Sequence, residues 1–292
     1  MFRLIVFLVV VLAASIAGHA QGPPWPAEWS AEQEPVRIFG NVYYVGTRGL
    51  SAVLITSGEG HVLIDGTMFE TAAAVVSHIR AAGFRVEDVK LIVNSHAHFD
   101  HAGGIGPLQR ASGARVAATP STARVLQQGS SGPDDPQYGV GLAVEPVKNV
   151  QVVKDGEALR VGPIAVTAHA TGGHTPGGTS WSWQSCEGSR CVRMVYADSL
   201  TAVAADNFLF TRSKEYPTAL ADFERGFATL STIPCDILLT PHPEMSDLWG
   251  RLAKRTPGGP TDPLVDATAC RRYADAGRKG LATRVARENS GR

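Results

Sequence analysis

Hydrophobic and polar positions alternate in two stretches near the start of the chain, residues 36–47 and 51–66. Alternation with a period of two is typical of half-buried strands, and a Gly-Glu-Gly interruption at residues 58–60 supplies a turn, so this region predicts a run of antiparallel strands. Residues 71–83 change to a helical spacing of apolar side chains and stop at Gly83, a residue type that often ends helices. These stretches therefore predict a sheet that is followed by a helix.

A nearly continuous apolar run at residues 88–95 predicts a strand that is covered on both faces. The succession of strands and then helix returns in the second half of the chain, although no residue-level repeat is visible. Further strands are predicted at residues 115–120, 150–156, 159–170, 179–185, 193–199 and 235–243, and further helices at residues 105–111, 121–128 and 217–231. This order predicts two sheets that pack together with helices outside.

Two segments fall outside this succession. A loop rich in Gly, Pro, Ser and Asp runs from Gly129 to about Pro146, and its length indicates a mobile or functional segment. The tail after Pro257 is rich in Arg and Ala, which predicts a surface helix that is anchored by Cys270 and frayed at its end.

Residues 1–20 have the composition of a secretory signal peptide. Arg3 precedes an apolar run from Leu4 to Ala17, which is shorter than the roughly 20 residues that span a bilayer, and small residues stand at the cleavage positions. We expect cleavage near Ala20, a periplasmic or secreted protein without stable membrane association, and a single domain over residues 21–292. An uncleaved N-terminal anchor is the alternative.

The charges of the chain are balanced. Lys+Arg and Asp+Glu both number 27, so the formal net charge is zero. A protein with no net charge has no overall electrostatic field that attracts nucleic acid or an anionic surface. We therefore expect a small neutral or modestly charged substrate and no nucleic-acid partner.

The four cysteines favour two disulfides over thiol chemistry, because an exported chain meets oxidising conditions. None has the C-x-x-C spacing of a zinc knuckle, and three pairings are possible. We prefer Cys186–Cys191, since the segment "CEGSRC" can form a hairpin tip closed by its own bridge, which leaves Cys235 to pair with Cys270.

Three of the nine histidines and one aspartate lie within "HAHFDH", residues 96–101, directly after the predicted buried strand. While the chain stays extended, His96 and His98 project in the same direction, and Asp100 and His101 then turn toward an adjacent point. One loop thus presents two imidazoles to one metal ion and an Asp-His pair to a second ion about 3.5 Å away. This dense pattern after an apolar strand indicates a metal site.

Two further histidines occupy tight turns near strand ends. His174 lies in "TGGHTPGG", and His242 follows an apolar strand and stands between two prolines. With the cluster they supply five histidines and one aspartate, enough for three protein ligands on each of two zinc ions. A lone histidine after a strand is more often a hydrogen-bonded structural residue, and this applies to the histidines that lack such a context, namely His19, His61, His78 and His169.

Nitrogen and oxygen ligands without thiolate favour zinc, ahead of iron and manganese. An open zinc site lowers the pKa of bound water to about 7, and a second zinc can hold the leaving atom, so the predicted chemistry is hydrolysis. The sequence contains no G-x-S-x-G, P-loop or G-x-G-x-x-G motif that would indicate serine catalysis or nucleotide binding.

The motifs "HAHFDHAGG", "GGHTPGG", "YADSL" and "TPHP" follow one another in an order and spacing that resembles the metallo-β-lactamase superfamily, over about residues 25–275. The chain is similar to the subclass B3 enzymes in particular, because His101 follows Asp100 and Ser199 stands where other subclasses place a cysteine ligand. The resemblance implies an α/β fold, the αββα sandwich, with two mixed sheets packed face to face and the site at one edge between them. It also implies that residues 21–292 form one catalytic domain.

The resemblance further implies residue roles. The first zinc ion would bind His96, His98 and His174, and the second would bind Asp100, His101 and His242. Ser199 and Thr201 would lie near the substrate carboxylate, while the loop of residues 129–146 and the segment near Trp25 and Trp29 would wall the substrate groove.

The implied activity is hydrolysis of the β-lactam ring of penicillins, cephalosporins and carbapenems, which confers antibiotic resistance. A zinc-bound hydroxide, oriented by Asp100, would attack the lactam carbonyl, and the second zinc would stabilise the leaving nitrogen. We expect a monomer with two Zn²⁺ ions and a small β-lactam as its substrate.

Two other functions remain possible on this scaffold. A thioesterase similar to glyoxalase II, or a lactonase, uses an aspartate at the end of the corresponding strand to bridge its metals, and Asp198 in "YADSL" stands near that position. Export, the paired cysteines and the segment 199–201 favour the lactamase. A non-enzymatic zinc-binding protein would be expected to lose ligands, whereas all six candidates are present.

Overall fold

The computed structural model describes residues 25–256, 259 and 261–291. The predicted signal peptide, residues 1–20, lies outside the described residues. Across the described ranges, no helix is both long enough and apolar enough to cross a membrane.

The first half of the chain forms a seven-stranded sheet in which the strands follow sequence order. The first three pairings are antiparallel, as the alternating pattern predicted, and the remaining three are parallel. The strands are β1 (Val36–Phe39), β2 (Val42–Tyr44), β3 (Val53–Ile55), β4 (His61–Ile64), β5 (Val89–Val93), β6 (Arg115–Ala118) and β7 (Val150–Val152). Strand β5 is the predicted apolar run, and only Lys90 of this strand is exposed.

The second sheet has five strands in the order β12-β11-β10-β9-β8. Its pairings are antiparallel except for β11 with β12. The strands are β8 (Ala158–Val161), β9 (Ile164–Ala170), β10 (Thr179–Glu187), β11 (Arg190–Tyr196) and β12 (Ile237–Leu239).

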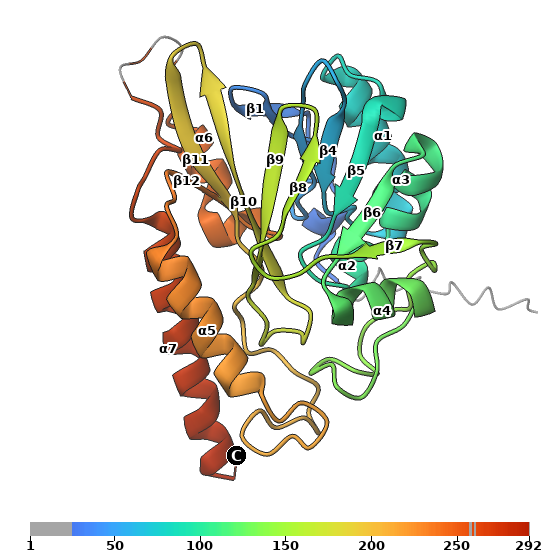
Figure 1. Cartoon of the computed structure of the whole chain (residues 1–292). Helices are drawn as coiled ribbons and strands as arrows, with labels where there is room; N and C mark the ends of the chain where they lie inside the picture. The colour runs from blue at the N-terminus through green and yellow to red at the C-terminus, as the bar shows by residue number, and fades with distance from the viewer. Residues whose placement is uncertain (1–24, 257–258, 260, 292) are drawn as a thin grey trace, which may run out of the picture.

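Helices cover the outer face of each sheet (Figure 1). The first sheet carries α1 (Ala72–Ala81), α3 (Ile105–Ser112) and α4 (Pro120–Gln128), and the second carries α5 (Ala219–Thr232) and α7 (Ala269–Asn289). Short elements lie at the edges: η1 (Ala27–Trp29), η2 (Phe69–Thr71), η3 (Val86–Asp88), α2 (Phe99–Ala102), η4 (Pro243–Ser246) and α6 (Leu248–Leu252). The predicted αββα sandwich is confirmed.

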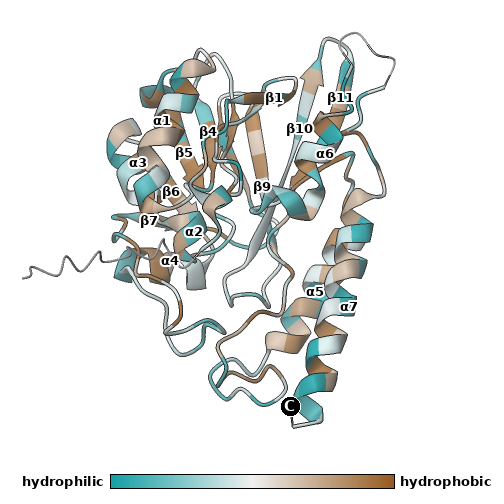
Figure 2. Ribbon diagram, turned by 180° about the vertical axis from the view of Figure 1, so that it is seen from behind, coloured by the Kyte–Doolittle hydropathy of each residue, from teal (hydrophilic) through white to brown (hydrophobic). Residues whose placement is uncertain are grey.

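Three apolar layers hold the sandwich together. One lies between the two sheets and includes Trp181, and one lies between the first sheet and its helices and includes Val75. The third joins the second sheet to α5 and α7 through residues such as Phe223 and Phe227. Figure 2 shows the hydrophobic colour along the strands of the interior and the hydrophilic colour on outward turns of α7, the arrangement expected when apolar area is removed from water.

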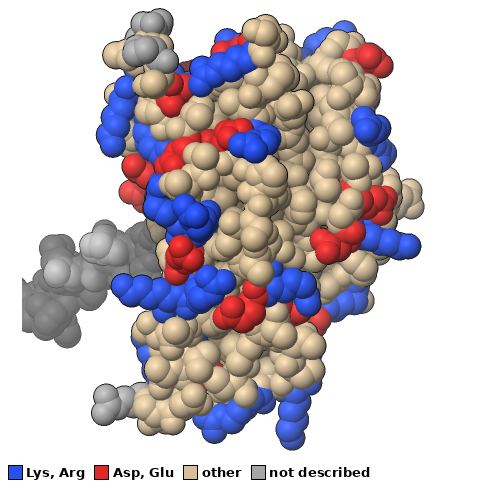
Figure 3. Space-filling model, turned by 60° about the vertical axis from the view of Figure 1, so that its left-hand side comes forward, with Lys and Arg blue, Asp and Glu red and all other residues tan. Residues whose placement is uncertain are grey.

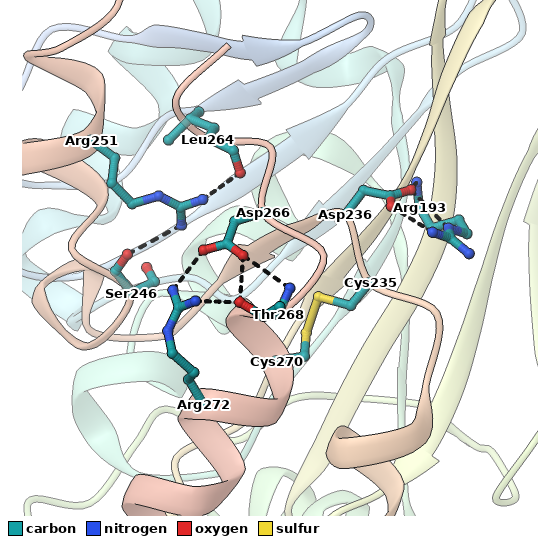
Figure 4. The surroundings of a disulfide bond; sticks show 10 residues. All are labelled: Arg193, Cys235, Asp236, Ser246, Arg251, Leu264, Asp266, Thr268, Cys270 and Arg272. Carbon is teal, nitrogen blue, oxygen red and sulfur yellow. Dashed lines mark hydrogen bonds and ion pairs between the residues drawn. A yellow bond between two sulfur atoms is a disulfide. The ribbon is translucent and has the colours of Figure 1, made fainter. Parts of the chain in front are cut away.

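Both predicted disulfides are present. Cys186–Cys191 closes the tip of the β10–β11 hairpin, and Cys235–Cys270 joins the start of β12 to the start of α7 (Figure 4). Helix α7 extends to Asn289, and a specific set of contacts holds its last turn. The buried Glu288 carboxylate there accepts hydrogen bonds from the backbone N–H groups of Phe210 and Thr211, and Arg284 donates a further one to it.

Candidate metal centre

Six histidine and aspartate side chains converge where the connections of the two sheets meet. They form a first cluster of His96, His98 and His174 and a second cluster of Asp100, His101 and His242, and within each cluster the candidate ligand atoms lie within 4.8 Å of one another. These are the six residues selected from the sequence. The structure therefore brings every predicted ligand to one place.

Both sheets contribute to each cluster. The segment after β5 supplies His96 and His98, and α2 supplies Asp100 and His101. The β9–β10 connection supplies the remaining histidine of the first cluster, and the segment after β12 supplies that of the second. Figure 1 shows α2 and the β9–β10 connection at the same end of the sandwich. The sequence predicted a loop at residues 96–101, whereas Asp100 and His101 lie on the helical turn α2.

The imidazole rings face one another edge to face. Ring centroids are 4.7 Å apart for His96 and His98, 4.8 Å for His96 and His174, and 5.0 Å for His98 and His174. The two clusters are adjacent, since the rings of His96 and His101 are 4.5 Å apart. This packing gathers nitrogen atoms around two neighbouring points.

Several buried nitrogens of these rings lack a hydrogen-bond partner among the described residues. They are Nε2 of His96, Nδ1 of His101 and Nδ1 of His242, while His101 Nε2 lies 3.1 Å from Asp100 Oδ2. A buried polar atom without a partner is unfavourable by about 1–3 kcal/mol, so several in one place need an explanation. Coordination of a metal ion would satisfy nitrogen atoms in this arrangement, and the donor set of imidazoles and one carboxylate fits zinc.

Three acceptors fix the outward-facing nitrogens of the first cluster. His96 Nδ1 lies 2.7 Å from Asp198 Oδ1, His98 Nε2 lies 3.0 Å from Asp135 Oδ1, and His174 Nδ1 lies 2.8 Å from the backbone oxygen of Thr201. Such contacts set the tautomer and orientation of metal-binding imidazoles. Sequence analysis missed Asp135, which lies in the loop of residues 129–146.

The fully buried carboxylate of Asp65 holds the chain just before the first cluster. Its oxygens accept hydrogen bonds from the side chain of Asn94, from both the backbone N–H and the hydroxyl of Ser95, and from the hydroxyl of Tyr196, all at 2.7–2.8 Å. Asp65 has φ +62°, a left-handed conformation that is unfavourable by roughly 1–3 kcal/mol for a non-glycine residue. Sequence analysis missed this residue too, although its position at the end of β4 gave a signal.

Electrostatics favour the metal-binding forms of three of these side chains, His96, His174 and Asp100. Burial, together with the neighbouring histidines, holds the pKa of His96 well below its usual value, and mainly burial lowers the pKa of His174 to about 3. Burial alone would raise the pKa of Asp100, but His101 and His242 outweigh it and hold that pKa well below its usual range. Near pH 7 the first two side chains are therefore neutral imidazoles and the third is a carboxylate.

A cavity of about 310 Å³ opens onto both clusters. Ser199 and Thr201 line it, as do Gln137 and Gly141 from the loop of residues 129–146, and Trp29 from the N-terminal segment packs against the ring of His242 at 5.3 Å. The segments expected to wall a groove do line this cavity. A larger cavity of about 760 Å³, whose lining includes Arg37, Arg48 and Trp249, contains none of the six clustered residues.

Histidines outside the motif make ordinary structural contacts. His169 Nε2 lies 2.7 Å from the hydroxyl of Ser182, and His78 is buried with Nδ1 3.1 Å from the backbone oxygen of Val45. Neither belongs to a cluster. Asp198, the residue that a bridging role would require, is fully buried behind His96 and does not belong to either cluster of the described residues.

Known proteins with solved structures match nearly the whole chain. Rm3 metallo-β-lactamase is 54% identical, with 90% of this chain and 97% of that chain covered and a TM-score of 0.88. MEM-A1, a subclass B3 metallo-β-lactamase from a soil metagenome library, is 49% identical, with 90% and 100% covered and a TM-score of 0.88. SMB-1, a metallo-β-lactamase in complex with mercaptoacetic acid, is 45% identical, with 89% and 99% covered and a TM-score of 0.85.

Two further comparisons cover shorter parts of the chain. A ribonuclease of Thermus thermophilus is 32% identical over 133 residues, which span 44% of this chain but only 30% of the ribonuclease. A family model described as the metallo-β-lactamase superfamily matches residues 45–187. The chain belongs to the metallo-β-lactamase superfamily, in the group of its subclass B3 members.

Proposed function

We propose that this protein is a zinc-dependent hydrolase that opens the β-lactam ring of penicillins, cephalosporins and carbapenems. The observation that carries the proposal is the pair of three-residue clusters facing one cavity, in a chain whose high-identity relatives are named metallo-β-lactamases. Such an activity would confer antibiotic resistance.

In this proposal two zinc ions are bound, one by the first cluster and one by the second. When bound, zinc acts as a Lewis acid that polarises a carbonyl group and makes water acidic enough to attack near neutral pH. The side chains behind the clusters keep the imidazoles oriented. Asp198 and Asp135 do so for His96 and His98, so the ligand geometry exists before substrate arrives.

Asp100 has the catalytic role among the chain's own groups. Its carboxylate lies in the cavity lining, where it can accept a hydrogen bond from the attacking water and direct that water at the carbonyl carbon. Ser199 and Thr201 line the same cavity, and in this proposal their hydroxyl groups would bind the carboxylate that β-lactams carry beside the ring. These contacts would fix the ring for attack.

A thioesterase or lactonase on the same scaffold would call for a carboxylate in the position of Asp198 that is shared between the metals. Here Asp198 Oδ1 lies 2.7 Å from His96 Nδ1, and the residue is absent from the cavity lining within the described residues. This arrangement favours the lactamase.

We also infer an exported enzyme with a signal peptide at residues 1–20 and one catalytic domain at residues 21–292. Two disulfides support export, because such bonds persist in oxidising compartments. Positive and negative side chains are interspersed on the face shown in Figure 3, in agreement with a small-molecule substrate instead of nucleic acid. We propose that the mature protein is a monomer without stable membrane association.

The test is hydrolysis of a chromogenic cephalosporin and a carbapenem by the purified mature protein, with and without a chelator, followed by added zinc. We expect activity that the chelator removes and zinc restores. A zinc-loaded protein that leaves both compounds intact would refute the β-lactam assignment, and thioesters and lactones would be assayed next.

A further inference from the structure

A second cavity, of about 350 Å³, opens beside the metal centre. We call it the α7 pocket. It lies between the segment of residues 200–203, Met245 of η4, and the α7 side chains of Tyr273 and Ala276 together with Gly277 and Gly280. Within the described part of the chain, no residue of its lining carries a formal charge.

The α7 pocket adjoins the cavity of the metal centre. Thr201, Val203 and Met245 line both. Val203, one of these shared residues, is 53% exposed, so both cavities can be reached from solvent at this position. A molecule bound at the clusters could therefore extend into the α7 pocket without leaving the protein surface.

Hydrogen bonds attach the walls of the α7 pocket to two clustered histidines and to Asp198 behind His96. The backbone oxygen of Thr201 accepts the hydrogen bond from His174 Nδ1, and the N–H of Met245 donates to the backbone oxygen of His242 at 3.0 Å. The hydroxyl of Tyr273 donates to the backbone oxygen of Asp198 at 3.1 Å. The pocket is thus held at a fixed position relative to the reacting centre.

Small residues of α7 keep the pocket hollow, and their environments differ. A Cβ atom at Gly277 would lie 2.8 Å from Phe227 Cε1 and 2.9 Å from Leu200 Cβ, so close packing of α7 explains that glycine. A Cβ atom at Gly280 would meet nothing within 4 Å. A glycine inside a helix is unfavourable by about 1 kcal/mol relative to alanine. Close packing therefore does not require a glycine at position 280, and a larger side chain can be introduced there without a clash.

We propose that the α7 pocket is a subsite for an apolar substituent of the substrate, of the class of an aryl or branched alkyl group. This inference rests on the proposed function. An apolar cavity of about 150 Å³ is already sufficient for benzene, so this pocket has room for a substituted ring. The uncharged lining would bind such a group by removing apolar area from water, which favours binding about tenfold or more.

The test introduces larger side chains on α7 that would fill the α7 pocket. A leucine side chain at position 280 would point toward the start of α7, over Ala276 and Gly277, which line the same pocket. The variants are Gly280→Leu and the smaller Gly280→Ala, which adds one methyl group. The matched control is Ala282→Leu, since Ala282 is exposed on α7 and two residues onward lies roughly on the opposite side of the helix.

The zinc-loaded enzymes would be assayed with two pairs of cephalosporins. In the first pair the two compounds differ only in the acylamino side chain, which carries an aryl group in one and a methyl group in the other. In the second pair the same difference lies in the substituent at the opposite end of the ring system. We expect Gly280→Leu to lower kcat/KM about tenfold for one of the two aryl compounds while its methyl partner is unaffected, with a smaller loss in Gly280→Ala and none in Ala282→Leu. An unchanged aryl-to-methyl ratio for both pairs in Gly280→Leu would overturn the subsite.

A second measurement separates this inference from the proposed function. If the unaltered enzyme hydrolyses none of the four compounds, the β-lactam assignment fails, and binding of the aromatic dye 8-anilinonaphthalene-1-sulfonate tests the pocket directly. Dye affinity about tenfold weaker in Gly280→Leu than in Ala282→Leu would support an apolar site. Equal dye affinity in the two variants would refute it.

Discussion

Replacement of Asp135 by alanine is expected to weaken zinc binding at the first cluster. The carboxylate is buried, and its two oxygens lie 3.0 and 3.2 Å from His98 Nε2. This contact occupies Nε2 and leaves Nδ1 as the nitrogen available for a metal ion. Without the Asp135 carboxylate the His98 ring can rotate, and its mostly buried Nε2–H loses its hydrogen-bond acceptor.

The expected magnitude follows from the role of such a carboxylate. Removal of a partner that orients a metal-binding histidine weakens metal affinity about 10- to 100-fold, which corresponds to roughly 1.4–2.7 kcal/mol. Asp135→Asn would retain an oxygen both for His98 and for the backbone N–H of Gln137, which the aspartate accepts at 2.8 Å. Because only the charge is lost, we expect an effect near the lower limit.

The assay is competition for zinc between the protein and a chromogenic chelator, with zinc stoichiometry measured in parallel. Asp134→Asn is the matched control, since Asp134 is adjacent in sequence but pairs with Arg124 instead of a histidine. If Asp135→Ala binds two zinc ions as tightly as the unaltered protein, or if Asp134→Asn loses as much affinity, the orienting role is refuted.

Three further predictions concern the site and the fold. His242→Ala should lower both zinc stoichiometry and hydrolysis, and full zinc content with full activity would remove His242 from the site. Ser199→Ala should raise KM about tenfold with kcat nearly unchanged, since a hydrogen bond to a charged group contributes roughly 1.5–3 kcal/mol; an unchanged KM would contradict its substrate contact. The double variant Cys235→Ser/Cys270→Ser should lose about 3–4 kcal/mol of unfolding free energy, because this bridge spans 35 residues, whereas the hairpin bridge, with a separation of 5, should contribute about 2 kcal/mol; equal losses in denaturant titrations would refute the loop-length argument.

The parts of this protein that sequence predicted well have local signals. Alternation at residues 36–47 predicted β1 and β2, and the dense motif at residues 96–101 predicted a metal-binding region, because both depend on neighbours in the chain. The pairing of Cys235 with Cys270 followed once the hairpin tip had been assigned to the other two cysteines.

The contacts that sequence did not predict join distant positions. Asp135 lies 37 residues from His98, and no pattern in the sequence distinguishes it from a solvated surface group. Asp65 follows an apolar strand, but its partner Ser95 lies 30 residues away, so the contact itself has no local signal. The contact at the end of α7 is equally distant in sequence. The buried Glu288 bonds to Phe210, 78 residues away.

Because each cluster takes residues from both sheets, the proposed zinc sites would act as cross-links between the two halves of the sandwich. A ligand that binds only the native state raises the unfolding free energy by RT ln(1 + [L]/Kd), about 2.7 kcal/mol per site at a free concentration of 100 Kd. The stability of the folded enzyme would then depend on the concentration of free zinc around it. At low zinc concentration the two sheets would be held together less strongly, and the hydrolytic activity would be lost as well.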